Sequence, residues 1–254
     1  MTLLRVSHVA KAFDGFRALD DVSFDIDAGE MVALIGPNGA GKSTCFNVLN
    51  GQLKPDAGSV AFDERSIEGL APRTIWRKGV ARTFQIAATF ASLSAIENVQ
   101  IALASREREL WRWWKPIADM HRDEALALLD RVGMAGAAER ACGVLAYGDV
   151  KRVELAMALA SRPRLLLMDE PTAGMSARDR ASLMTLVRAL VVEGGVAVLF
   201  TEHSMDAVFG YADRVLVMAR GRVIAEGPPD AIRRDAKVSE IYFGTGSLLD
   251  EALP

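Results

Sequence analysis

The beginning of the chain alternates between apolar and polar positions. Val22, Phe24 and Ile26 are apolar, and the residues between them are polar. This period of two is typical of a strand with one buried face. A continuous apolar run such as Met31–Ile35 is instead expected of a strand buried on both faces of a parallel sheet. Strands are predicted at Met31–Ile35, Gly58–Phe62, Val80–Phe84, Leu165–Met168, Val196–Thr201 and Arg214–Met218.

Between these segments, apolar residues recur at helical intervals. From about Ile86 to Arg162 the strand-like runs disappear and helical spacing takes over, as at Ala125, Leu128 and Leu129. We therefore predict an inserted helical subdomain there. Because strands alternate with helices elsewhere, a doubly wound α/β sheet is predicted for the rest. Further helices are predicted at Lys42–Asn50, Ala177–Glu193 and Ser204–Gly210.

Composition excludes several classes of protein. The chain has 254 residues and 50% of them are hydrophobic, yet no apolar run approaches the roughly 18–20 residues that cross a bilayer. A net charge of −3 gives no basic footprint for nucleic acid. Two cysteines, Cys45 and Cys142, cannot form a disulfide framework, which favours a reducing compartment. The N-terminus does not read as a signal peptide. We therefore expect a cytosolic chain that forms one domain.

The strongest chemical signal is the loop that follows Met31–Ile35. Its sequence, Gly36-Pro-Asn-Gly-Ala-Gly-Lys-Ser, matches the phosphate-binding pattern G-x-x-x-x-G-K-[ST] between a predicted strand and a predicted helix. Glycines let backbone N–H groups turn toward phosphate oxygens, and the helix start adds its dipole. Lys42 supplies a charge for the β- and γ-phosphates, and the Ser43 hydroxyl suits Mg²⁺. The predicted nucleotide contacts are Gly36, Asn38, Gly39, Ala40, Gly41, Lys42, Ser43 and Thr44.

Two carboxylates follow the apolar run Leu165–Met168. Asp169 and Glu170 would lie at the carboxyl edge of the sheet, which is the side where ligands bind. Asp169 suits the Mg²⁺ shell, and Glu170 would activate a water for attack on the γ-phosphate. The alternative is a strand followed by a solvated acidic turn. The phosphate loop on the same chain favours the catalytic interpretation.

These motifs resemble the ATP-binding subunit of ABC transporters across nearly the whole chain. The resemblance implies that Gln85 is the Q-loop glutamine, which contacts Mg²⁺ and the attacking water and senses the membrane partner. It also implies that His203 is the switch histidine at the γ-phosphate, and that Phe13 stacks on adenine. The segment Ala173–Ser176 matches the D-loop. The signature motif, which closes on ATP held by a second subunit, is matched by Leu145, Ala146, Tyr147, Gly148 and Asp149.

The roles implied for these side chains fall into two sets. The catalytic set is Glu170, His203 and Gln85, and the Mg²⁺ ligands are Ser43, Gln85 and Asp169.

The chain departs from the family's usual motifs at four positions. Ala146 replaces a serine, Tyr147 a glycine and Asp149 a glutamine, and the D-loop ends in Ser176 rather than aspartate. Loss of the serine hydroxyl removes a hydrogen bond to a charged phosphate, worth about 1.5–3 kcal/mol. The altered signature resembles the branch that serves high-affinity branched-chain amino-acid uptake. The D-loop, the switch region and the tail from Gly227–Ile232 onward fit that branch too.

The resemblance implies a particular fold and division of the chain. It implies an α/β fold with a P-loop NTPase (RecA-like) core, an N-terminal antiparallel β subdomain and an inserted α-helical subdomain. A single ABC ATPase domain would span residues 1–254. Its nucleotide-binding core would comprise 1–85 and 163–254, and the helical subdomain with the signature motif would comprise 86–162.

The implied function is the ATP-hydrolysing cytosolic subunit of an ABC importer that uses ATP and Mg²⁺. It would power uptake of a small solute, above all branched-chain or related amino acids. The implied partners are a second ATPase subunit, in a homo- or heterodimer, the transmembrane permease subunits and indirectly a solute-binding protein, with no nucleic acid. The chain would then lie at the cytoplasmic face of the plasma membrane, attached through the permease.

Three alternatives stay open. One is a transporter of another solute, such as urea, an amide or a lipid-like molecule. A second is a soluble ABC-type ATPase without a transport role, which the single ATPase unit and the balanced charge disfavour. The third is a regulatory subunit that binds ATP without turnover, which the presence of Glu170 and His203 disfavours.

A tryptophan cluster in the helical region has two interpretations. Trp111, Trp113 and Trp114 lie beside Arg112 and Lys115. The cluster either covers the core of the subdomain or forms a patch near the membrane partner, since aromatic residues and arginine are enriched at interfaces.

Overall fold

A computed structural model describes residues 1–83, 89–107 and 120–243 of the chain. Gln85 and the tryptophan cluster lie outside the described residues. Within the described part, no helix is long and apolar enough to cross a membrane.

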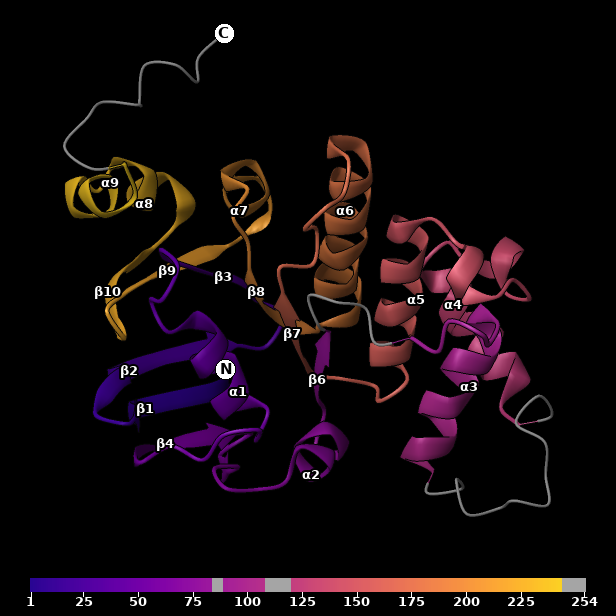
Figure 1. The fold of residues 1–254 in the computed structure, drawn as a ribbon, viewed down its shortest axis with the longest axis horizontal. Helices are drawn as coiled ribbons and strands as arrows, with labels where there is room; N and C mark the ends of the chain where they lie inside the picture. Colours follow the sequence, from indigo (N-terminus) through magenta and orange to yellow (C-terminus); the bar gives the residue numbers. More distant parts are fainter. Residues whose placement is uncertain (84–88, 108–119, 244–254) are drawn as a thin grey trace, which may run out of the picture.

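A six-stranded sheet forms the centre of the molecule (Figure 1). Its strand order is β10-β9-β3-β8-β7-β6, and every neighbouring pair is parallel except β10 with β9. The strands are β3 (Met31–Ile35), β6 (Val80–Thr83), β7 (Leu165–Asp169), β8 (Ala197–Thr201), β9 (Arg214–Ala219) and β10 (Arg222–Gly227). The central strands β3 and β8 are buried along their whole length, which explains their continuous apolar sequences.

A second, antiparallel sheet is built mainly from the N-terminus. Its strand order is β2-β1-β4-β5. Its strands are β1 (Thr2–Phe13), β2 (Phe16–Asp27), β4 (Ala57–Phe62) and β5 (Arg65–Ser66). Alternate residues of β2 are buried, as the period of two predicts. The antiparallel β subdomain expected from the family resemblance is therefore present.

The central sheet separates two hydrophobic cores. Along β3, Met31, Ala33 and Ile35 belong to one core, and Val32 and Leu34 belong to the other. The second core joins the central sheet to the antiparallel sheet and to α1 (Lys42–Leu49). The first core contains the helices on the opposite face of the sheet. A doubly wound α/β arrangement is thus confirmed.

A group of helices lies to one side of the central sheet, at the right of Figure 1. It contains α3 (Ala95–Arg106), α4 (Arg122–Arg131) and α5 (Tyr147–Leu159), with two short 3-10 turns at Ala135–Ala137 and Cys142–Val144. Ser94 caps α3: its hydroxyl accepts from the Glu97 N–H at 3.3 Å, and its own N–H donates to the Glu97 carboxylate at 2.8 Å. No named strand occurs among the described residues between 86 and 162.

The remaining helices pack around the sheets. They are α2 (Pro72–Arg77), α6 (Ala177–Gly194), α7 (Met205–Tyr211), α8 (Pro229–Arg234) and α9 (Ala236–Phe243). The sequence predicted α6 and α7 closely and did not predict α2, α8 or α9. Both α2 and α8 have proline in the first turn, which is a start signal that could have revealed them.

Candidate functional site

The phosphate loop connects β3 to α1 and packs closely against neighbouring backbone. A Cβ added at Gly36 would lie 2.2 Å from the Met218 carbonyl oxygen, and one added at Gly41 would lie 2.5 Å from the Ala18 carbonyl oxygen. The Gly221 N–H also donates to the Ala40 carbonyl at 3.0 Å. Strand β9, its hairpin turn and strand β2 therefore support the loop, and glycine is required where backbone meets backbone.

The Lys42 ammonium lies inside this loop. It donates to the Gly36 carbonyl at 2.6 Å and to the Pro37 carbonyl at 3.2 Å. Partial burial lowers the pKa of Lys42, while the Glu170 and Asp169 carboxylates act in the opposite direction. A half-buried cation whose only described hydrogen-bond acceptors are neutral carbonyls is suited to binding phosphate.

A pocket of about 220 Å³ unites the two motifs that the sequence analysis singled out. The phosphate loop forms one wall and the end of β7 forms the other, although some 125 residues separate them. Because both follow strands of one parallel sheet, they meet at its carboxyl edge. The pocket is lined by Phe16, Ala18, Asn38, Gly39, Ala40, Gly41, Lys42, Ser43, Thr44, Asp169 and Glu170.

A larger hollow of about 1010 Å³ adjoins this pocket. It shares Phe16 and the loop residues 38–40 with the phosphate pocket, and it extends to Arg17, Arg220 and Glu240. Together the two spaces offer room for the phosphates and for a nucleoside beside them.

Asp169 is fixed by two polar contacts. The Arg82 guanidinium donates to one carboxylate oxygen at 2.9 Å, and the Thr201 hydroxyl donates to the other at 2.9 Å. Arg82 is itself held by the Asn47 side chain at 2.7 Å, and its guanidinium carbon lies 5.6 Å from the centre of the Phe46 ring. Arg82 thus links α1 to β7. No motif in the sequence indicates this role of Arg82.

Glu170, which lines the pocket, lies side by side with His203. The His203 Nε2 and a Glu170 carboxylate oxygen are 2.9 Å apart. Glu170 has a left-handed backbone, with φ of 47°, and its N–H donates to the Thr201 hydroxyl at 3.0 Å. The buried carboxylate of Glu202, which precedes His203 in the chain, accepts from the Thr172 hydroxyl at 2.6 Å. A strained backbone held by its neighbours is typical of a functional position.

The two aromatic residues beside the β1–β2 turn, Phe13 and Phe16, differ in their relation to the pocket. Phe16 is 65% exposed and lines both the phosphate pocket and the larger hollow. Phe13 is 42% exposed, lies opposite Phe16 in the hairpin, and has the Lys11 ammonium 5.7 Å from its ring centre. Phe13 lines neither space. Phe16 is therefore a pocket residue that the sequence analysis missed.

The signature segment, residues 145–149, leads into α5. Ala146 is the residue before the helix and Asp149 is in its first turn. A Cβ added at Gly148 would lie 3.3 Å from the Met175 methyl group, and one at Gly174 would lie 3.8 Å from the Tyr147 ring. The signature segment therefore packs against the D-loop of the same chain. None of its residues lines the phosphate pocket.

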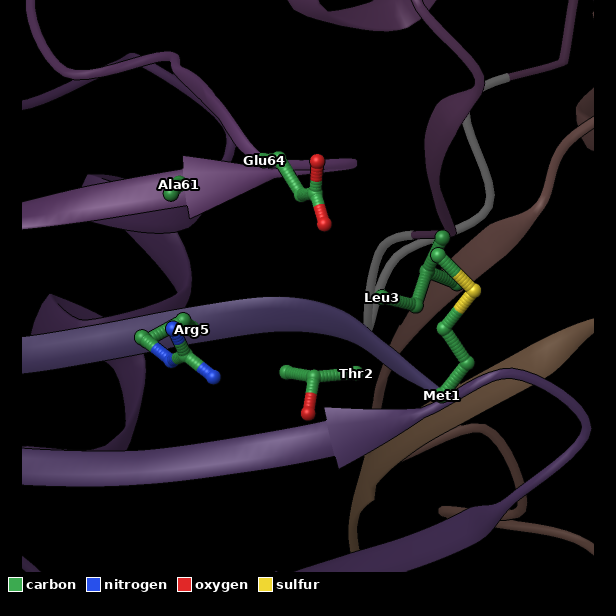
Figure 2. Close-up of a pocket in the computed structure, with 6 residues that line it drawn as sticks. All are labelled: Met1, Thr2, Leu3, Arg5, Ala61 and Glu64. Atoms are coloured by element: carbon green, nitrogen blue, oxygen red, sulfur yellow. The ribbon is translucent and has the colours of Figure 1, made fainter.

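A small pocket lies elsewhere, between the start of β1 and the β4–β5 turn (Figure 2). It measures about 190 Å³ and is lined in part by Met1, Arg5 and Glu64. Arg5 is already paired with Asp25 at 3.3 Å. This pocket shares no residue with the phosphate pocket.

Comparison with known proteins identifies the family. The model of the family described as ABC transporter matches residues 19–173. The chain belongs to the ABC transporter family. A second model, described as Branched-chain amino acid ATP-binding cassette transporter, matches residues 222–247. The LivG protein of Salmonella typhimurium, named as a high-affinity branched-chain amino acid transport ATP-binding protein, is 36% identical over 249 residues, covering 95% of this chain and 98% of LivG.

Solved structures agree with this assignment. The ADP conformation of MJ1267, an ATP-binding cassette of an ABC transporter, has a TM-score of 0.86 and 33% identity, covering 96% of this chain and 99% of that one. A dimeric cassette, MJ0796 bound to ADP and Pi, has a TM-score of 0.76 and 26% identity, covering 89% of this chain and 99% of that one. This chain is thus an ABC ATPase, the ATP-hydrolysing cassette of a transporter.

Proposed function

We propose that this cassette powers the uptake of branched-chain amino acids. The choice of solute rests on the match of the branched-chain family model to residues 222–247. This segment lies beyond the part that the general ABC transporter model covers. The relatedness to LivG over 95% of the chain supports the same solute. The ATPase site itself is compatible with any transported molecule, because the phosphate loop, β7 and β8 form a site for the nucleotide and not for the solute.

In the proposed reaction, Glu170 orients the water that attacks the γ-phosphate. Its carboxylate borders the pocket in which Lys42 would bind the phosphates. His203, 2.9 Å from Glu170, would hold that carboxylate in place and reach the γ-phosphate oxygens. Positioning and electrostatic stabilisation account for most of the catalysis in phosphoryl transfer.

Mg²⁺ fits the oxygen groups at the bottom of the pocket. We assign its binding to the Ser43 hydroxyl, to Asp169 and, by resemblance alone, to Gln85. Among the described residues no group of three or more His, Cys, Asp or Glu side chains could hold a metal by itself. This is the arrangement expected of Mg²⁺ that arrives with nucleotide phosphates and keeps several waters. The ion would neutralise charge on the phosphates.

Hydrolysis is proposed to occur between two cassettes. The signature residues Leu145, Ala146, Tyr147, Gly148 and Asp149 would then contact ATP held by the second subunit. The dimeric structure of MJ0796 supports such an arrangement. Because Ala146 lacks a hydroxyl, the backbone N–H groups at the start of α5 would provide the contact. Phe16 would contact the nucleoside, with Phe13 beside it.

We further propose that residues 86–162 form a subdomain that moves against the core of residues 1–85 and 163–254, and that this motion reaches the permease. A groove of about 440 Å³ lies between these two parts and is lined by Trp76, Ile101, Ala102 and Met157, among others. Its apolar lining and its place at the junction suit a permease segment. The cassette would then lie at the cytoplasmic face of the membrane, and a solute-binding protein would act on the far side.

Uptake by the native host tests the proposed solute. Deletion of this chain should abolish uptake of radiolabelled leucine, isoleucine and valine, and the wild-type chain should restore it. The Lys42→Ala variant, which removes the phosphate-binding cation, should not restore it. Unchanged leucine uptake after deletion would contradict the proposal. Loss of urea or lipid uptake instead would identify a different solute for the same ATPase.

A further inference from the structure

Helix α5 carries two buried charges in its middle. The Lys151 side chain is 3% exposed and the Glu154 side chain 6%, with the ammonium 3.1 Å from the carboxylate. Bringing two charges out of water costs free energy that their attraction barely offsets, so a buried pair of this kind is weak evidence for stability. Fixing a geometry is a better-supported use of such a pair.

The Lys151 ammonium also faces the ring of Tyr147. The ammonium lies 5.8 Å from the ring centre, within the range of a cation–π contact. Tyr147, Lys151 and Glu154 are spaced four and three residues apart, so they follow one face of the helix. Lys151 therefore contacts Glu154 on one side and the Tyr147 ring on the other.

Tyr147 is the least buried member of this row, at 45% exposure, and it lies in the signature segment. Its ring is adjacent to Gly174, where an added Cβ would be 3.8 Å from a ring carbon. Gly148, the next residue, lies in the first turn of α5. A large ring that rotated freely at this place would compete for the space in front of the Gly148 backbone.

We propose that Lys151, anchored by Glu154, is a positioning residue that holds the Tyr147 ring against the D-loop turn. The backbone at the start of α5 is thereby left open for the nucleotide of the second cassette. The inference rests on the proposed hydrolysis between two cassettes. Ala146 makes the positioning more consequential, because the backbone must supply the contact that a serine hydroxyl would otherwise share.

The test is ATP-driven dimerisation of the full chain, measured by sedimentation in a Glu170→Gln background that blocks turnover. The variant Lys151→Met with Glu154→Leu removes both charges of the pair at similar volume. We expect its melting temperature to equal or exceed that of the parent, and its affinity for a fluorescent ATP analogue as a monomer to be unchanged. Its dimer dissociation constant should rise at least five-fold.

Two comparisons separate positioning from a general packing effect. Lys151→Arg keeps a cation over the ring and should restore dimerisation to within two-fold of the parent. Removal of another ion pair of the helical region, by Arg106→Met with Glu124→Leu, should lower the melting temperature without changing the dimer dissociation constant. That pair joins α3 to α4 at 2.9 Å.

A double-mutant cycle decides the role of Tyr147. In a Tyr147→Leu background, which changes an exposed side chain and should fold, loss of the Lys151–Glu154 pair should weaken dimerisation no further. The inference is overturned if the charge-free variant dimerises within two-fold of its parent, or if its full effect persists in the Tyr147→Leu background. If the Glu170→Gln parent itself fails to dimerise with ATP, the proposed hydrolysis between cassettes is wrong instead.

Discussion

Replacing Gly36 by alanine would place a methyl group against the backbone of β9. The added Cβ would lie 2.2 Å from the Met218 carbonyl oxygen and 3.0 Å from the Ala40 Cβ. Neither contact is the flexible end of a long side chain, so the phosphate loop or the strand must shift. Gly210, in α7, is a matched control because nothing lies within 4 Å of a Cβ added there.

The magnitude follows from these contacts. Overpacking a well-filled site typically costs about 1–3 kcal/mol, and a clash with backbone at this distance belongs at the upper end. For a chain of this size, about 3 kcal/mol lowers the melting temperature by roughly 6–12 °C. Gly210→Ala should instead raise the melting temperature, because alanine stabilises a helix by about 0.5–1 kcal/mol relative to glycine.

Thermal unfolding of both variants, followed by circular dichroism, measures these effects, and ATP titration of each measures the site. Gly36→Ala should also bind ATP at least ten-fold more weakly, because the loop that surrounds Lys42 is displaced. If Gly36→Ala melts within about 2 °C of wild type and binds ATP normally, the close support of the loop by β9 is wrong.

Three further predictions concern residues around the site. Phe16→Ala should raise the Kd for ATP at least five-fold, since stacking of an aromatic ring on a base is worth about 1–3 kcal/mol. Phe13→Ala should raise the Kd less. A larger increase for Phe13→Ala in fluorescence titration would refute the assignment of Phe16 to the nucleoside. Burial raises the pKa of the Cys45 thiol from 9.0 to about 12. Between these pH values the thiol ionises only in the unfolded chain, so the free energy of unfolding should fall by up to about 1.4 kcal/mol per pH unit. In urea unfolding, Cys45→Ala should reduce this dependence of stability on pH. Arg82→Met leaves the mostly buried Asp169 carboxylate without its arginine partner and should lower the free energy of unfolding by about 3 kcal/mol. Arg5→Met, whose ion pair is exposed, should lower it by less than about 1 kcal/mol; equal effects of the two substitutions would contradict the structure.

Local patterns predicted much of the fold because the rules behind them are local. The bounds of the strand Met31–Ile35 are those of β3, since five buried apolar residues end at the glycine loop. The strand Val80–Phe84 agrees with β6 as far as Thr83, beyond which residue 84 lies outside the described part. The edge strand β10 was missed because most of its residues are only half-buried and follow no clean alternation.

The site could be predicted only in part. The phosphate loop and the pair Asp169 and Glu170 each follow a strand, so sheet geometry brings them together. Phe16 and Arg82 were missed because their roles depend on which hairpin and which helix approach the pocket. The burial of Lys151 in α5 is likewise invisible in the sequence, where a lysine in a helix indicates a solvated face.

Hydrolysis by the Glu170→Gln variant tests the proposed catalytic site most directly. The substitution removes the carboxylate that contacts His203 and borders the phosphate pocket, but leaves Lys42 and the loop intact. ATP affinity, measured by calorimetry with Mg²⁺ present, should stay within a few-fold of wild type. Phosphate release should fall to near zero, and ATP should stabilise dimers of the variant. Phosphate release at the wild-type rate would contradict the role assigned to Glu170.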